Sequence, residues 1–224
     1  MRSLIITLVC VLLFSLSAIN KTSFASDINV KYSVAMPFPQ NHLFEISISV
    51  DNYSYASDGY IDLTLPAWRS GRYVILDPSS GVQEFSAEAG DGEKLSWSKT
   101  DKDTWRVQYI SGKPFNVKYK VYSNEFSIRT RGLNDECGFI DASAVLMYAE
   151  KLRSNPLEVK IIPYKDWHVT TGLDRIDGME NSFYARDYDY LADCPLLIGN
   201  QKDHDFFIYD KKFIVSFPPD QVYD

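Results

Sequence analysis

Hydrophobic and polar side chains alternate along much of the chain from residue 30 onward. In residues 44–50, apolar Phe44, Ile46 and Ile48 are separated by single polar residues. A period of two places successive side chains on opposite faces, which is typical of a strand with one buried face. The same alternation predicts strands at residues 30–36, 61–65, 105–109, 115–121, 126–130, 157–161 and 167–169, and further strands are predicted at 206–209 and 212–217.

Turn-forming residues interrupt this alternation and divide it into short strands. Examples are Asp58-Gly59, Ala89-Gly90-Asp91-Gly92 and Ser111-Gly112-Lys113-Pro114. No long window keeps the apolar spacing of a helix, and the nearest candidate, Ala142–Arg153, fits a short helix or a strand. We therefore expect an all-β fold, β-sandwich-like, with two curved, mainly antiparallel sheets and little helix.

The first 25 residues have the pattern of an export signal. Arg2 precedes an apolar stretch from Leu4 to Ile19, and small residues at Ser23 and Ala25 suit cleavage before Ser26. The stretch has 16 residues, shorter than the roughly 20 that a membrane-spanning helix needs, and no later segment could span a bilayer. The sequence predicts a signal peptide at 1–25 and one exported domain, periplasmic or extracellular, at 26–224.

Composition narrows the classes of partner. Hydrophobic residues make up 45% of the chain and aromatic residues 14%, which describes a globular domain rather than a disordered segment. Acidic residues number 30 against 23 basic ones, and the net charge is −7. An acidic chain lacks the electrostatic footprint for nucleic acid or an anionic membrane surface, so we expect neither partner.

The familiar catalytic motifs are absent from the sequence. His42, His168 and His204 are far apart, and no HExxH motif joins two of them. A nucleophile elbow of the GxSxG type, a glycine-rich phosphate loop and CxxC pairs are also missing. We expect no catalytic residue, metal site or cofactor in this chain, although three separate imidazoles could still converge on zinc in space.

Two further features have both a functional and a structural interpretation. The acidic string Asp187-Tyr188-Asp189, followed by Asp193, could bind calcium, but we favour a solvated loop whose carboxylates cap backbone groups. Exposed aromatic rings on a β-sandwich can bind sugars, yet core packing is the favoured interpretation. The tryptophans concerned are Trp68, Trp97, Trp105 and Trp167.

Two cysteines remain after the leader, because Cys10 would leave with it. Cys137 and Cys194 could form one disulfide in an oxidising compartment. Two separate, half-buried thiols are the alternative.

Several short strings, taken in order, resemble a known family. They are Tyr32-Ser33-Val34-Ala35-Met36, Leu65-Pro66-Ala67-Trp68-Arg69-Ser70-Gly71-Arg72-Tyr73, Ser127-Ile128-Arg129-Thr130, Gly138-Phe139-Ile140-Asp141 and Asp187-Tyr188-Asp189-Tyr190-Leu191-Ala192-Asp193-Cys194-Pro195. In order and spacing they resemble the N-terminal domain of the glycyl aminopeptidase family of zinc metallopeptidases, family M sixty-one, from Val30 to about Gly199. Ser70, Arg72, Asp141 and Cys194 depart from the usual pattern, which has Asn at the place of Asp141 and often Ser at that of Cys194.

The resemblance implies a β-rich domain that packs on a thermolysin-like catalytic domain holding zinc, and this catalytic part is absent here. By the same resemblance, residues 138–148 would lie nearest the catalytic cleft. Asp141 could then meet a substrate amine, and Arg129 is a second substrate-cleft candidate.

Three functional hypotheses follow. The first is a non-catalytic N-terminal domain of such a metallopeptidase, in a truncated or split protein, with a catalytic domain or a peptide as partner. The second is an independent exported β-sandwich module that binds peptide or glycan. The third is a peptidase in its own right. An apolar patch larger than a monomer normally shows would favour the first, and a concave site lined by aromatic rings the second.

Overall fold

The computed structural model describes residues 30–51, 59–68, 74–125 and 131–217. The expected signal peptide, the expected strand at 126–130 and Arg129 lie outside the described residues. Within the described ranges, no helix is both long and apolar enough to cross a membrane.

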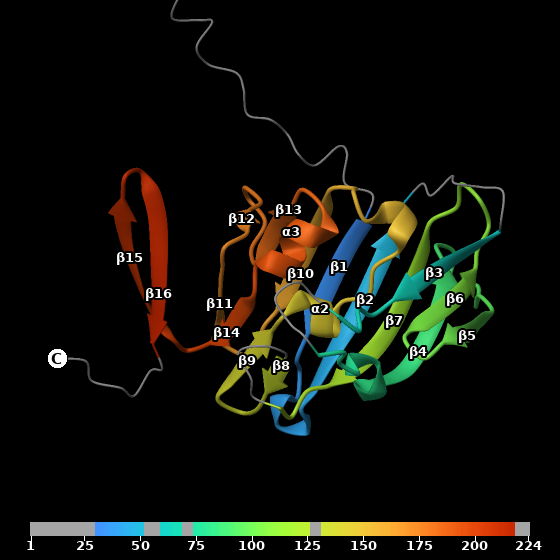
Figure 1. Cartoon of the computed structure of the whole chain (residues 1–224), viewed down its shortest axis with the longest axis horizontal. Coiled ribbons are helices and arrows are strands. Elements are labelled where there is room, and N and C mark those ends of the chain that lie inside the picture. Colours follow the sequence, from blue (N-terminus) through green and yellow to red (C-terminus); the bar gives the residue numbers. More distant parts are fainter. Residues whose placement is uncertain (1–29, 52–58, 69–73, 126–130, 218–224) are drawn as a thin grey trace, which may run out of the picture.

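The largest element is a seven-stranded sheet with the order β12-β13-β10-β1-β2-β7-β4. Strands β1 and β10 run parallel, and the other neighbours in this sheet are antiparallel (Figure 1). Its strands are β1 (Val30–Ala35), β2 (Leu43–Val50), β4 (Val82–Ala89), β7 (Phe115–Tyr122), β10 (Leu157–Ile162), β12 (Asp174–Arg175) and β13 (Ser182–Ala185).

Three smaller antiparallel sheets complete the described strands. A four-stranded sheet has the order β11-β14-β9-β8, a three-stranded sheet the order β3-β6-β5, and β15 pairs with β16 alone. Their strands are β3 (Tyr60–Thr64), β5 (Trp97–Asp101), β6 (Thr104–Gln108), β8 (Arg131–Leu133), β9 (Cys137–Ile140), β11 (His168–Thr171), β14 (Leu196–Gly199), β15 (Lys202–Ile208) and β16 (Lys211–Phe217).

In the described ranges, helical structure is limited to short turns. They are η2 (Pro39–Asn41), η3 (Pro78–Gly81), α2 (Ala142–Val145), η4 (Glu150–Leu152) and α3 (Tyr188–Asp193). The ambiguous segment Ala142–Arg153 contains two separate turns, α2 and η4, rather than one helix or one strand.

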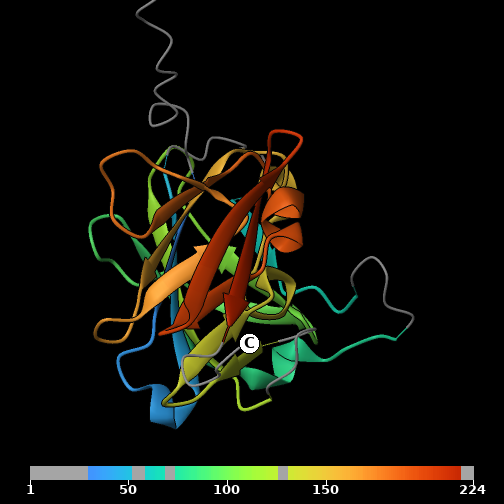
Figure 2. The same cartoon turned by 90° about the vertical axis from the view of Figure 1, so that its left-hand side faces the viewer.

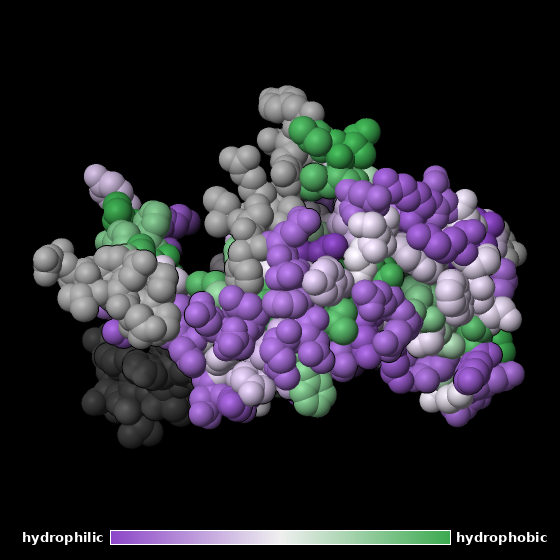
Figure 3. Space-filling view, turned by 90° about the horizontal axis from the view of Figure 1, so that it is seen from below, coloured by the Kyte–Doolittle hydropathy of each residue, from purple (hydrophilic) through white to green (hydrophobic). Residues whose placement is uncertain are grey.

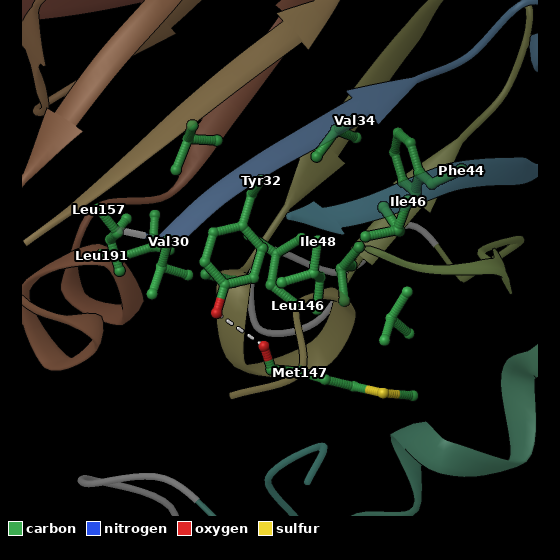
Figure 4. Packing of buried hydrophobic residues seen from close by; sticks show 14 of the residues in the cluster. Val30, Tyr32, Val34, Phe44, Ile46, Ile48, Leu146, Met147, Leu157 and Leu191 are labelled. Atoms are coloured by element: carbon green, nitrogen blue, oxygen red, sulfur yellow. Dashed lines mark hydrogen bonds between the residues drawn. The ribbon is translucent and has the colours of Figure 1, made fainter. Parts of the chain in front are cut away.

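The core lies on one face of the large sheet, where the alternation predicted it. Val30, Tyr32 and Val34 of β1 are buried, as are alternate residues of β2 and β7. In Figure 4 Tyr32 of β1 points toward Met147 and Ile48 of β2 lies beside Leu146, and both of these partners follow α2. The opposite face is polar and carries ion pairs such as Lys118–Glu88 and Lys120–Glu84. A sheet with one face packed and one face wet is typical of antiparallel architecture.

The all-β, sandwich-like fold class is therefore confirmed, and two details differ from it. The strands are divided among one large and three smaller sheets, and the large sheet contains a parallel pair.

Candidate functional site

Three buried tyrosine hydroxyls hold the backbone that follows α2. They come from β1, β7 and α3 and donate to the carbonyls of three consecutive residues. The bonds are Tyr119 to Val145 (3.0 Å), Tyr188 to Leu146 (2.7 Å) and Tyr32 to Met147 (2.8 Å). The Met147 amide in turn donates to the Tyr119 hydroxyl at 2.9 Å. Buried backbone carbonyls need such partners, so the tyrosines fix a segment that has no strand ladder at these positions.

Burial also changes the acid–base chemistry of these tyrosines. Desolvation raises the pKa of Tyr32, Tyr119 and Tyr188 above the usual value for a phenol, because the charged form loses its hydration. At neutral pH all three phenols are therefore neutral donors, and they act as structural clamps.

Asp141 begins this segment as a helix cap. Its side chain is 4% exposed, and Oδ1 accepts from the Ser143 amide at 3.0 Å and from the Ser143 hydroxyl at 2.6 Å. An Asp at the N-cap satisfies an amide that α2 leaves unpaired, which explains this residue without a substrate. Its proposed contact with a substrate amine stays a prediction.

A groove of about 420 Å³ adjoins α2. It is lined by Leu76, Asp77, Pro78, Ser80, Gly81, Tyr122, Ser123, Asn124, Glu125, Arg131 and Ala144. Arg131 joins the two helical turns beside the groove, because its Nη1 donates to the carbonyl of Pro78 at 3.0 Å and to that of Ala144 at 2.5 Å. Gly81 permits this approach, since a Cβ at that position would lie 2.3 Å from Arg131 Nη2.

The charges of the groove largely offset one another. Burial lowers the pKa of Arg131, while the carboxylates of Glu125 and Asp77 act in the opposite direction. Hydrogen bonds from Lys102 and Ser79 lower the pKa of Asp77, with Lys102 Nζ at 3.0 Å from its Oδ2. Such an arrangement can hold a polar group, but its lining residues include no nucleophile paired with a base of the kind that hydrolysis uses.

Histidines and acidic residues do not gather into a metal centre in the described part of the chain. No group of three or more His, Cys, Asp or Glu side chains is placed to hold a metal ion there. His42 Nδ1 contacts the Leu133 carbonyl, His168 lies 3.4 Å from Asp203, and His204 packs edge-on against Phe217. The three imidazoles therefore have separate surroundings.

The two cysteines are free in this structure, so the possible disulfide is not formed. The register explains why. Gly199 lies opposite Cys137 and Leu196 opposite Ile140, which places Cys194 beyond the other end of β14. At about 3.3 Å per residue, β14 alone separates Gly199 from Leu196 by roughly 10 Å, and Cys194 lies two residues further on, whereas a disulfide needs Cα atoms within about 7 Å.

The acidic string near the C-terminus caps backbone, as expected, but within a helix rather than a loop. Asp187 caps α3 by accepting from the Tyr190 amide at 2.6 Å. Asp189 lies in the first turn and pairs with Arg153 at 2.9 Å. No calcium site is needed to explain these carboxylates.

The four tryptophans divide between core and surface. Trp105 and Trp167 are buried, whereas Trp68 is 56% and Trp97 43% exposed. Trp97 packs edge-on against Phe85 at 4.8 Å between ring centroids.

Sequence reasoning did not single out Arg131, because nothing in its neighbourhood signalled the carbonyls of residues 78 and 144 that it joins. Its only signal is an alternating position two residues after Arg129.

Comparison with known proteins identifies the family. The model of the peptidase M61 N-terminal domain matches residues 31–200. The chain belongs to this family. No curated protein matches it.

Solved structures agree with this membership. A crystal structure of an aminopeptidase N family protein from Idiomarina loihiensis superposes with a TM-score of 0.75 and 27% identity, covering 84% of this chain and 32% of that one. An M1 zinc metallopeptidase from Deinococcus radiodurans, an E323A mutant bound to a Tyr-Ser-Ala substrate, matches with a TM-score of 0.52 and 12% identity, covering 88% of this chain and 49% of that one. The second likeness concerns the fold alone. This chain thus spans a third to a half of the length of these proteins.

Proposed function

We propose that this chain is a non-catalytic domain that packs on a metallopeptidase catalytic domain belonging to the same enzyme type. The observation that carries the proposal is the family match over residues 31–200, combined with a span of only 32% of the Idiomarina protein. The larger part of that protein lies outside the region that matches this chain. Its remainder is therefore the natural place for the zinc-binding machinery of the family.

The described chemistry is consistent with this role. Asp141, Arg131 and the three buried tyrosines each have a structural partner within the domain. The Arg131 groove does not resemble a sugar platform either, because Tyr122 is the only aromatic residue among its described lining residues. This groove therefore does not meet the criterion set out from the sequence for an independent glycan-binding module, a concave site lined by aromatic rings.

We propose further that the domain is exported after loss of residues 1–25, on the basis of the leader pattern. Mass measurement of the protein recovered from the extracytoplasmic fraction tests this, with Ser26 expected as the first residue. Recovery of a chain that still starts at Met1 would contradict it.

Association with a catalytic domain is tested directly by a binding titration. The chain without its leader would be titrated against the part of the Idiomarina protein that lies outside the matched region. We expect a saturable complex of one chain to one catalytic fragment. No binding at any concentration accessible to the assay would contradict the proposed function. An HExxH-bearing reading frame next to the gene would give it independent support.

A further inference from the structure

We propose that the outward face of the hairpin β15–β16 is the surface that docks onto the metallopeptidase catalytic domain. The inference rests on the proposed function and names the contact through which it would act. The hairpin follows the residues matched by the family model, which end at 200, and forms a two-stranded sheet of its own. It stands apart from the rest of the fold in Figure 1, and in Figure 2 it lies in front of the body, facing the viewer.

The register of the hairpin divides its side chains into two unlike faces. Residues directly opposite each other in an antiparallel pair lie on the same face. One face contains the pairs His204–Val215, Phe206–Phe213 and Ile208–Lys211, together with Phe217 opposite Lys202. The other contains the pairs Asp203–Ser216, Asp205–Ile214 and Phe207–Lys212. The first face is mostly apolar, and we call it the apolar face.

At the base of the hairpin, the polar face meets the body of the domain. Asp203 Oδ2 accepts from the Thr170 hydroxyl at 2.5 Å and lies 3.4 Å from His168 Nε2, both on β11. Ser216 donates to Asp203 Oδ1 at 2.7 Å across the hairpin. These contacts anchor the base of the hairpin by its polar face, so the apolar face points away from the domain.

The apolar face is exposed from the pair His204–Val215 to the tip of the hairpin, and Phe217 at the base is part-buried. Phe206 is 43% and Phe213 44% exposed, although their rings stack at 5.3 Å. Green residues at the left of Figure 3 show the hydrophobic surface of the hairpin. An isolated two-stranded hairpin is marginally stable in water, and apolar side chains gathered on one exposed face mark a surface that a partner can cover.

The position of the hairpin in the chain and its free strand edges favour a catalytic domain as the partner that covers the apolar face. The hairpin lies where the matched N-terminal domain ends, and in the similar solved structures most of the protein lies outside the matched part. Neither strand has an outer neighbour among the described strands, so both edges present backbone groups to which a partner sheet can add. A partner with an apolar sheet surface and a free strand would satisfy both features.

The test uses the same titration as above with three forms of the leaderless chain. The double variant Phe206→Ser, Phe213→Ser removes the two stacked rings from the apolar face. Phe207→Ser is the matched control, because Phe207 is 70% exposed on the opposite face of the same strand. We expect the double variant to bind at least ten-fold more weakly and the control to bind within two-fold of the unmodified chain. Thermal melts of all three should coincide, since the exposed hairpin lies outside the core.

Hydrogen exchange supplies a second readout. Amides of residues 202–217 should exchange at least ten-fold more slowly in the complex than in the free chain. If the unmodified chain binds and the double variant binds equally well, the docking inference is overturned while the proposed function stands. If the unmodified chain fails to bind, both are overturned. A concentration-dependent dimer of the chain that the double variant loses would assign the face to self-association and overturn the inference.

Discussion

The hydroxyl of Tyr32 on β1 donates a hydrogen bond of 2.8 Å to the backbone carbonyl of Met147, 115 residues further along the chain. Figure 4 shows this bond crossing from the large sheet to the segment after α2. The segment thus depends on residues distant in sequence for its conformation. The tyrosine hydrogen bonds therefore hold this segment against the large sheet.

Replacing Tyr32 should destabilise the fold without changing its shape. Tyr32→Phe leaves the buried Met147 carbonyl without this donor, and an unsatisfied buried polar group costs about 1–3 kcal/mol. Urea denaturation should report a loss in that range. Tyr209→Phe is the control, because Tyr209 is 96% exposed in the hairpin turn and its hydroxyl loss should change stability by less than about 0.5 kcal/mol. Equal losses of stability in the two variants would contradict the role of the Tyr32 hydroxyl as a clamp.

The buried tyrosines also predict a loss of stability in alkaline solution. Their pKa is raised in the folded state, so unfolded chains release these protons near pH 10 while folded chains retain them. Their contribution is complete below pH 10 and falls as pH rises above it, by about 1.4 kcal/mol per pH unit for each tyrosine. The free energy of unfolding, measured between pH 9 and 11, should therefore fall less steeply in Tyr32→Phe. Parallel curves would show that Tyr32 ionises normally in the fold.

Substitutions of Asp141 test whether this residue acts as a helix cap or as a substrate ligand. Asp141→Ala should cost about 0.5–2 kcal/mol, because the Ser143 amide and hydroxyl lose their acceptor. Asp141→Asn keeps an acceptor oxygen and should cost distinctly less in the same denaturation assay. A structural cap therefore predicts tolerance of Asn. Equal destabilisation by Ala and Asn would show that the negative charge itself is required.

The cysteines should behave as two thiols. In the chain without residues 1–25, alkylation after unfolding without reductant should add two labels to the mass, one each at Cys137 and Cys194. Labelling of the folded protein at neutral pH should be slow, because burial raises the pKa of both thiols and reduces the thiolate fraction. A chain that accepts labels only after reduction would contradict the strand register given above.

Sequence reasoning succeeded where side chains alternate without interruption. The buried face of β2 and β7 follows directly from residues such as Ile46 and Val117, because half-buried antiparallel strands expose one face to water. It missed β4, where Glu84 adopts a positive φ of 52° and the pairing shifts between Gln83 and Ser86. A bulge of this kind breaks the period of two on which the prediction depends. All residues of β5 are exposed, so no apolar pattern marked that strand.

The candidate site was less predictable because it depends on contacts between distant residues. Capping by Asp187 could be anticipated from the string itself, since an Asp accepts from amides two or three residues later. The Arg131 contacts to carbonyls 53 and 13 residues away carry no local signal. The strands of the hairpin were predicted, but only the cross-strand register shows which side chains share a face, and only the Asp203 contacts show which face meets the domain at the base.

The central claim is that this domain serves a catalytic partner and hydrolyses no peptide by itself. Turnover of short glycyl and alanyl peptides by the purified chain, with Zn²⁺ added, tests it most directly. We predict no hydrolysis above the rate without protein, and no zinc retained in stoichiometric amount after dialysis. Hydrolysis in proportion to the chain, lost on substitution of His42, His168 or His204, would contradict it.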